Sequence, residues 1–207
     1  MKRCIIFVMI AAGVLLTPQR ATAVTRAGLL KLSLDSSFIG FGTGEIDPEG
    51  GDDNDFGAPT FGVGLSSPGI GLGYTVIDKL VIGGRVTLGV QGHDDLFGDY
   101  ESFFWSVLPY FEYIFLSGVA RPFVTGTLGF EGVKVDAFDD DGRWWWGFTF
   151  GGGGGAHFFV IEQVSLDAML LLTFTVGGGE DERPDDDLDF KLWHFKLSGL
   201  FGLSAWF

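Results

Sequence analysis

Alternation of apolar with small or polar residues is the feature that most constrains how this chain can fold. In the last thirteen residues, the odd-numbered positions from Phe195 to Phe207 are mainly large and apolar, while the even positions include Lys196 and Ser198. A period of two residues is typical of a β-strand, because successive side chains point to opposite faces. The same pattern recurs upstream, so we expect an all-β chain.

Eight segments carry this strand pattern, and two kinds of connection separate them in turn. The predicted strands are residues 29–42, 60–76, 80–90, 102–116, 123–135, 144–159, 164–176 and 190–207. The long connections hold most of the acidic residues together with Gly, Pro and Asn, so they are predicted to be solvated loops; they are residues 43–59, 91–101, 136–143 and 177–189. The short connections are residues 77–79, 117–121 and 160–163.

The two faces of these segments differ in a way that indicates a membrane. One face is rich in Phe and Trp, as with Phe103 and Phe111, while the other carries Gly, Ser, Thr and charges, as with Ser106 and Glu112. Small residues suit a narrow interior, so the apolar face is predicted to meet lipid. A closed barrel also satisfies every backbone group in hydrocarbon. We therefore predict a closed antiparallel eight-stranded transmembrane up-and-down β-barrel.

The N-terminal residues have the pattern of an export signal. Lys2 and Arg3 precede an apolar run, and Ala21-Thr22-Ala23 forms a small-x-small cleavage site. We expect residues 1–23 to be a signal peptide and residues 24–207 to be the barrel domain. The single cysteine, Cys4, lies in the expected signal peptide, so no disulfide is predicted in the mature chain.

The chain resembles the small eight-stranded outer-membrane barrels of Gram-negative bacteria, of the OmpA/OmpX type. The resemblance covers the whole expected mature chain. It implies that the alternating C-terminal strand, with its final aromatic residue, is read by the barrel assembly machinery. The residues that match this signal are Phe195, Leu197, Phe201, Leu203 and Phe207. It also implies location in the cell outer membrane.

Two prolines depart from the strand pattern. Pro68 and Pro109 fall inside predicted strands, where each removes a backbone donor. The second strand also changes face near Ser66 and Ser67, since its apolar residues are odd-numbered before this point and even-numbered after it. A β-bulge there is expected.

Nine charged or histidine residues fall on the predicted inner face. Buried charges without partners are very costly, so these side chains should pair into a network inside the barrel. They are Lys31, Asp35, Arg85, Glu112, Glu131, His157, Asp167, His194 and Lys196. The network is predicted to be a structural plug, because eight strands leave an interior that side chains just fill. Narrow ion conduction is the alternative use of the same residues.

Catalysis is a second alternative. His93 and Ser102 bracket the second long acidic segment in the inward phase, near Asp94, Asp95 and Asp99. A base and nucleophile there could serve an outer-membrane lipid-modifying hydrolase of the lipid A deacylase kind. The His-x-Ser pattern of such deacylases is absent from the sequence. We therefore predict a non-enzymatic envelope protein, with a soluble periplasmic ligand-binding barrel as a third hypothesis.

Other motifs predict partners only weakly. Gly151 to Gly155 is glycine-rich like a phosphate loop but lacks its Lys-Ser/Thr, so it is interpreted as close strand packing. A net charge of -14 argues against nucleic acid. No cofactor or specific metal site is predicted.

The acidic groups Asp52-Asp53, Asp139-Asp140-Asp141 and Asp185-Asp186-Asp187 are expected to be a solvated rim that shares Ca²⁺ or Mg²⁺ with lipopolysaccharide. Trp144-Trp145-Trp146 fits an interfacial aromatic girdle, and a monomer is expected.

Overall fold

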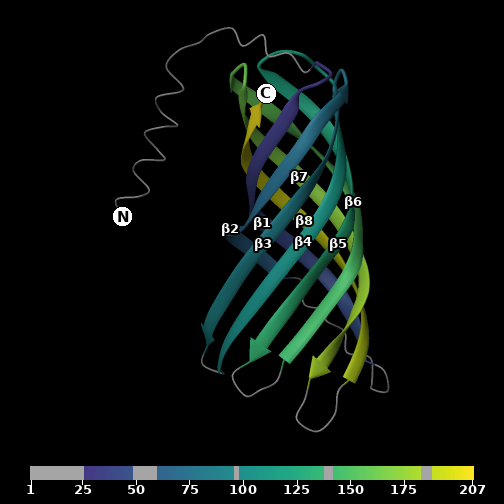
Figure 1. Cartoon of the computed structure of the whole chain (residues 1–207). Coiled ribbons are helices and arrows are strands. Elements are labelled where there is room, and N and C mark those ends of the chain that lie inside the picture. The colour runs from purple at the N-terminus through teal and green to yellow at the C-terminus, as the bar shows by residue number, and fades with distance from the viewer. Residues whose placement is uncertain (1–25, 49–59, 96–97, 138–141, 183–187) are drawn as a thin grey trace.

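The computed structural model describes residues 26–48, 60–95, 98–137, 142–182 and 188–207, which form one closed barrel of antiparallel strands (Figure 1). Each strand pairs with the next in the chain, and β1 pairs with β8. The strands are β1 (Leu30–Pro48), β2 (Thr60–Ile77), β3 (Leu80–Asp95), β4 (Gly98–Ile114), β5 (Ala120–Ala137), β6 (Gly142–Ile161), β7 (Val164–Glu182) and β8 (Leu188–Trp206). The predicted eight-stranded up-and-down barrel is confirmed.

The C-terminal strand closes the barrel. The N–H of Leu30 donates to the carbonyl of Phe207 at 2.9 Å, and the N–H of Phe207 donates to the carbonyl of Leu30 at 2.9 Å. The pairing of β1 with β8 continues from Lys31↔Trp206 to Pro48↔Phe190. No helix in the described part of the chain is long and apolar enough to cross a bilayer. Residues 1–25, which include the predicted signal peptide, lie outside the described residues.

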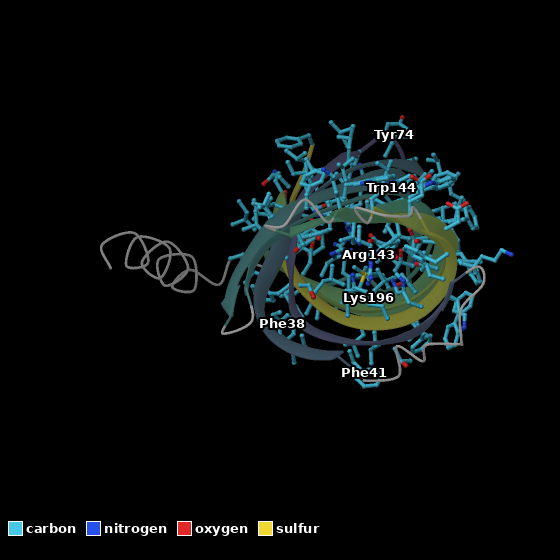
Figure 2. All side chains as sticks on the ribbon, turned by 90° about the horizontal axis from the view of Figure 1, so that it is seen from below. Phe38, Phe41, Tyr74, Arg143, Trp144 and Lys196 are labelled. Atoms are coloured by element: carbon cyan, nitrogen blue, oxygen red, sulfur yellow. The ribbon has the colours of Figure 1, made fainter. Side chains whose placement is uncertain are left out.

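Large apolar side chains cover the outside of the barrel. In Figure 2, Phe38, Phe41 and Tyr74 lie outside the ring of strands, whereas Arg143 and Lys196 lie within it. Along β7, Leu170 and Leu172 are 60% and 42% exposed, while the alternate residues Met169, Leu171 and Thr173 are buried. The predicted assignment of faces is thus observed, and it is opposite to that of a soluble barrel with an apolar interior and a polar exterior.

The strands continue further into the acidic segments than predicted. The prediction that residues 91–101 form a loop is wrong, because β3 and β4 stay paired as far as Asp95↔Gly98. Likewise β7 runs to Glu182, and it pairs with β6 as far as Glu182 and with β8 as far as Asp181. The strands are 16 to 20 residues long, whereas roughly 9–11 residues span the hydrocarbon. Apolar alternation marks only the lipid-facing length, while ladder hydrogen bonds continue beyond it.

The predicted β-bulge is confirmed in β2. Ser36 pairs with Pro68 and Ser37 with Ser66, so Ser67 is the extra residue. The other proline is accommodated without a change of register: Pro109 pairs with Gly84 of β3, but the β4–β5 pairing skips Leu108 and Pro109. The hydroxyl of Thr127 donates to the Pro109 carbonyl at 2.9 Å and bridges the interruption.

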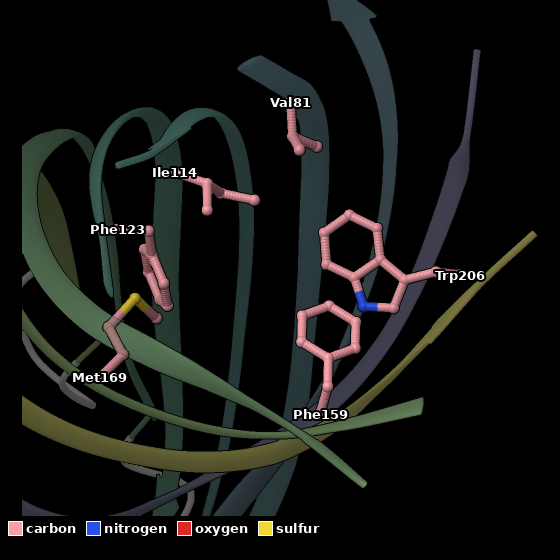
Figure 3. Close-up of a cluster of buried hydrophobic side chains, with 6 residues drawn as sticks. All are labelled: Val81, Ile114, Phe123, Phe159, Met169 and Trp206. Carbon is pink, nitrogen blue, oxygen red and sulfur yellow. The ribbon is translucent and has the colours of Figure 1, made fainter. Parts of the chain in front are cut away.

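An apolar cluster fills the barrel at the end with the short turns (Figure 3). We call it the apolar plug; it consists of Val81, Ile114, Phe123, Phe159, Met169 and Trp206. These six residues are 0–9% exposed. The Phe159 and Trp206 rings lie 5.8 Å apart between centroids. The interior is therefore mainly apolar at this end, and most of its charged residues lie further along.

Candidate functional site

Four of the nine predicted inner-face residues form one buried ionic cluster. Lys31 of β1 places Nζ 2.8 Å from Oε2 and 3.0 Å from Oε1 of Glu112 of β4. His157 of β6 joins two carboxylates, with Nε2 2.9 Å from Glu112 Oε1 and Nδ1 2.6 Å from Asp167 Oδ1. Lys31, Glu112 and His157 are at most 4% exposed. We call this group the lower cluster, counting from the short-turn end of the barrel, which Figure 1 draws at the top.

Hydroxyls complete the hydrogen bonding of the lower cluster. Ser165 donates to Asp167 Oδ1 at 2.7 Å, and Ser204 donates to Asp167 Oδ2. Trp206 of the apolar plug donates its indole N–H to the Ser165 hydroxyl at 3.2 Å. The His157 ring stacks on the Phe123 ring, with the two ring centroids 4.4 Å apart. Buried charges are tolerated when they are paired in this way, so the cluster can hold the strands together from inside.

A second ion pair lies beside the lower cluster. Arg85 Nε of β3 lies 3.0 Å from Asp35 Oδ2 of β1, across the intervening β2. This pair has room because β2 carries a glycine there: a Cβ added to Gly69 would lie 2.9 Å from Asp35 Oδ1. The guanidinium of Arg85 also lies 5.9 Å from the centre of the Tyr110 ring.

The remaining three inner-face residues lie nearer the acidic end. His194 Nε2 of β8 is 3.0 Å from Glu131 Oε1 of β5, and the Thr175 hydroxyl also donates to Glu131. Because Thr175 donates its proton there, Thr149 is the donor in the 2.8 Å bond between the two threonines. Lys196 lies inside the ring of strands (Figure 2) and is exposed. We call Glu131, His194 and Lys196 the upper cluster, because it lies further from the short-turn end, toward the acidic end at the bottom of Figure 1.

Little free space remains around the lower cluster. A cavity of about 20 Å³ is lined by Lys31, Asp35, Arg85, Glu112, His157, Asp167 and apolar neighbours. A single water needs about 10–15 Å³ of such space. The interior at this level therefore has room for about one water, and the arrangement fits a plug better than a channel.

Arg121 is an interior residue that the sequence interpretation missed. It is 1% exposed, its Nε donates to the Gly118 carbonyl at 3.0 Å, and its guanidinium lies 4.5 Å from the centre of the Phe159 ring. It was placed in a predicted turn of residues 117–121, but β5 begins at Ala120. Extending the odd-numbered inward phase of Phe123 back by two residues would have found it.

The structure bears differently on the other predicted sites, namely the phosphate loop, the His93–Ser102 dyad and the acidic groups. The phosphate-loop interpretation of Gly151 to Gly155 is excluded, because all five glycines lie within β6 and pair with both neighbours. Ser102 pairs with Gln91 and His93 with Tyr100 in the β3–β4 ladder, but the His93 side chain lies outside the described side chains, so the dyad stays a prediction. Among the described residues, no group of three or more His, Cys, Asp or Glu could hold a metal ion. The acidic groups at residues 52–53, 139–141 and 185–187 lie outside them.

Comparisons with known proteins find solved structures with a similar fold. No family model matches the chain, and no curated protein matches it. Among solved structures, Neisserial surface protein A is 16% identical, with 86% of this chain and 98% of that chain covered and a TM-score of 0.50. The outer membrane protein OprG from Pseudomonas aeruginosa is 14% identical, with 89% and 98% covered and a TM-score of 0.55. The chain therefore has the fold of the small eight-stranded outer-membrane barrels, as the resemblance in sequence implied.

Proposed function

We propose that this protein is a non-enzymatic integral barrel of the cell outer membrane, with a structural or surface-interaction role in the envelope. The observation that carries the proposal is the outer wall, where residues such as Ile70, Leu88, Leu128, Leu170 and Phe201 are each at least 50% exposed. So much apolar surface on a closed barrel calls for lipid rather than water around it. The fold shared with OprG supports the same location.

The proposed orientation places the acidic end outside the cell. The short turns and the apolar plug then lie at the periplasmic end, together with the closing pair of Leu30 and Phe207. Acidic groups at the outer end would share Ca²⁺ or Mg²⁺ with lipopolysaccharide. The assembly machinery would read the C-terminal strand, in which Leu197, Phe201, Leu203 and Phe207 are 38–67% exposed on the lipid side and Phe195 is half-buried.

The nine inner-face residues are proposed to act as a structural plug. The pairs Lys31–Glu112 and Arg85–Asp35 each join strands that are not neighbours in the sheet, so they brace the barrel from inside. The cavity of about 20 Å³ beside them supports a closed interior. Ion conduction, the alternative role, would need a continuous water-filled path past the lower cluster.

Protease treatment of intact cells tests location and orientation together. We expect the protein in the outer-membrane fraction, with cuts confined to residues 49–59, 96–97, 138–141 and 183–187. Permeabilised cells serve as the control, in which cuts in the short turns near Lys79 or Gly118 become accessible. Cuts at these short turns in intact cells, or recovery of the chain from the periplasm without detergent, would refute the proposal.

A further inference from the structure

Two rows of outward-facing residues cross β6, β7 and β8 near their acidic ends. In the first row, Trp146 pairs with Gly178, and Gly178 pairs with Lys191. In the second row, two residues closer to the acidic end, Trp144 pairs with Glu180, and Glu180 with Asp189. The centre of the first row therefore has no side chain, and tryptophans and charged groups surround the gap.

This gap is a hollow in the outer wall. Its volume is about 280 Å³, and its lining includes Trp144, Trp146, Gly178, Glu180, Asp189 and Lys191. That volume is close to the lower end of the roughly 300–1,000 Å³ of small-molecule sites. Trp146 is 50% exposed. We call this feature the Trp-Gly hollow.

The height of the Trp-Gly hollow in the wall narrows the choice of ligand. The next outward row away from the acidic end is apolar, with Phe148 paired to Val176 and Val176 to Trp193. Phe174 and Trp193 belong to the same apolar part of the wall, and their rings stack with centroids 6.0 Å apart. At the opposite edge of the hollow, toward the acidic end, the lining residues Glu180 and Asp189 are acidic. The hollow thus lies where the apolar wall ends, which is the level of lipid headgroups in an outer-membrane barrel.

The chemistry of the lining matches a sugar that carries phosphate. Indole faces offer flat apolar surface to the C–H groups of a sugar ring. The carboxylates of Glu180 and Asp189 accept hydrogen bonds from hydroxyls, whereas the Lys191 ammonium donates to phosphate oxygens. An acyl chain offers no polar group to these charged side chains. A plain phosphate would face the two carboxylates, whereas a phosphorylated sugar can turn its hydroxyls toward them and its phosphate toward Lys191.

We infer that the Trp-Gly hollow binds the phosphorylated sugar headgroup of a glycolipid from the surrounding outer leaflet. This inference rests on the proposed function, since it requires the barrel to lie in that leaflet. The headgroup ring would lie over Gly178 between Trp146 and Lys191, with its hydroxyls toward Glu180 and Asp189. A bound glycolipid would anchor the barrel at a fixed height and add a lipid surface to the acidic end.

The test measures retention of lipid A by the full chain. The protein is placed in nanodiscs of phosphatidylcholine with lipid A, or with phosphatidylglycerol as a phosphate without sugar, and lipids retained after transfer to detergent are counted by native mass spectrometry. We expect the wild type to retain lipid A at least ten-fold more than phosphatidylglycerol. The double variant Trp146→Ala with Lys191→Gln should lose at least ten-fold of that retention.

A matched control removes an aromatic residue and a lysine at the other end of the barrel. Tyr74→Ala with Lys79→Gln alters an outward-facing residue of β2 and the short turn before β3, and it should retain lipid A like the wild type. Circular dichroism checks that each variant folds. Should the Trp146 double variant not fold, Lys191→Gln and Asp189→Asn carry the test, because both alter exposed side chains conservatively; each should lose at least three-fold.

Three results would overturn the inference: equal retention by the Trp146 double variant and its control, equal retention of phosphatidylglycerol, or the same affinity for a water-soluble sugar phosphate as for lipid A. Each leaves the proposed function standing if fractionation still finds the chain in the outer membrane. Absence from that membrane, by contrast, would refute the proposed function itself.

Discussion

The Nζ atom of Lys31 lies 2.8 Å from Oε2 of Glu112 although the two residues belong to β1 and β4, which are not neighbours in the sheet. Both side chains are 5% exposed. The pair therefore crosses the interior and links two walls of the barrel. If either residue were removed, the other would be a buried charge without its partner, which is strongly destabilising.

Glu112→Gln should destabilise the barrel by about 3–5 kcal/mol, because it leaves the buried Lys31 charge without its partner. The double variant Lys31→Met with Glu112→Leu should recover part of this loss, since it removes both charges and keeps the volume but leaves His157 Nε2 without Glu112. Denaturant unfolding in lipid vesicles measures both. Lys79→Gln, in an exposed turn, is the control and should change stability little. A double variant as unstable as Glu112→Gln would show that the pair is not the cause.

The apolar plug and the lower cluster should block the interior in series. We expect no conductance steps from the wild type in planar bilayers. Phe159→Ala with Trp206→Ala should stay closed, as should Lys31→Ala with Glu112→Ala, because each leaves one layer intact. Only the combination of all four should conduct. Steps from the folded wild type would instead favour the conducting alternative.

Inward glycines of β6 should tolerate substitution less than outward ones. A Cβ added to Gly153 would collide with the Leu170 carbonyl and lie 3.0 Å from the Leu171 Cα, whereas one added to Gly154 would come no closer than 3.2 Å to the Phe123 carbonyl. Gly153→Ala is expected to cost about 1–3 kcal/mol by overpacking. Gly154→Ala should cost less than about 1 kcal/mol, because an alanine also restricts the unfolded chain. Denaturant midpoints of the two variants compare them directly, and equal midpoints would argue against the difference in packing.

The side chain of Phe207 should matter for assembly in cells more than for stability. Its backbone groups close the barrel with Leu30, and its ring is 67% exposed. Phe207→Ala keeps both backbone bonds and removes the ring. We expect a several-fold drop of folded protein in the outer membrane but refolding in detergent micelles like the wild type. An equal defect in micelles would mean that the ring stabilises the barrel rather than signals.

The faces of the strands could be predicted from the sequence, but the depth of each residue in the interior could not. A period of two assigns Val81, Ile114 and Trp206 to the inner face and says nothing of whether they meet each other or the charged residues. The register of distant strands decides that. The apolar plug was therefore not foreseen, although each of its inward positions fits the pattern.

The pairing within the candidate site was likewise beyond the sequence. His157 and Asp167 lie on adjacent strands joined by a short turn, so their contact follows from local register. The contact of Lys31 with Glu112 depends on the curvature of the closed barrel, which no local pattern encodes. The ends of the strands were misplaced for a different reason, because ladder hydrogen bonds continue where apolar side chains stop.

The inside-out arrangement of side chains is the central claim, and spin-label accessibility along β7 in lipid vesicles tests it most directly. Single cysteines at residues 169 to 173, in a chain with Cys4→Ser, would each carry a nitroxide. We predict that labels at Leu170 and Leu172 relax with lipid-soluble oxygen and not with a water-soluble nickel complex, while the label at Thr173 is shielded from both. Strong relaxation by the nickel complex at Leu170 and Leu172 would contradict the account.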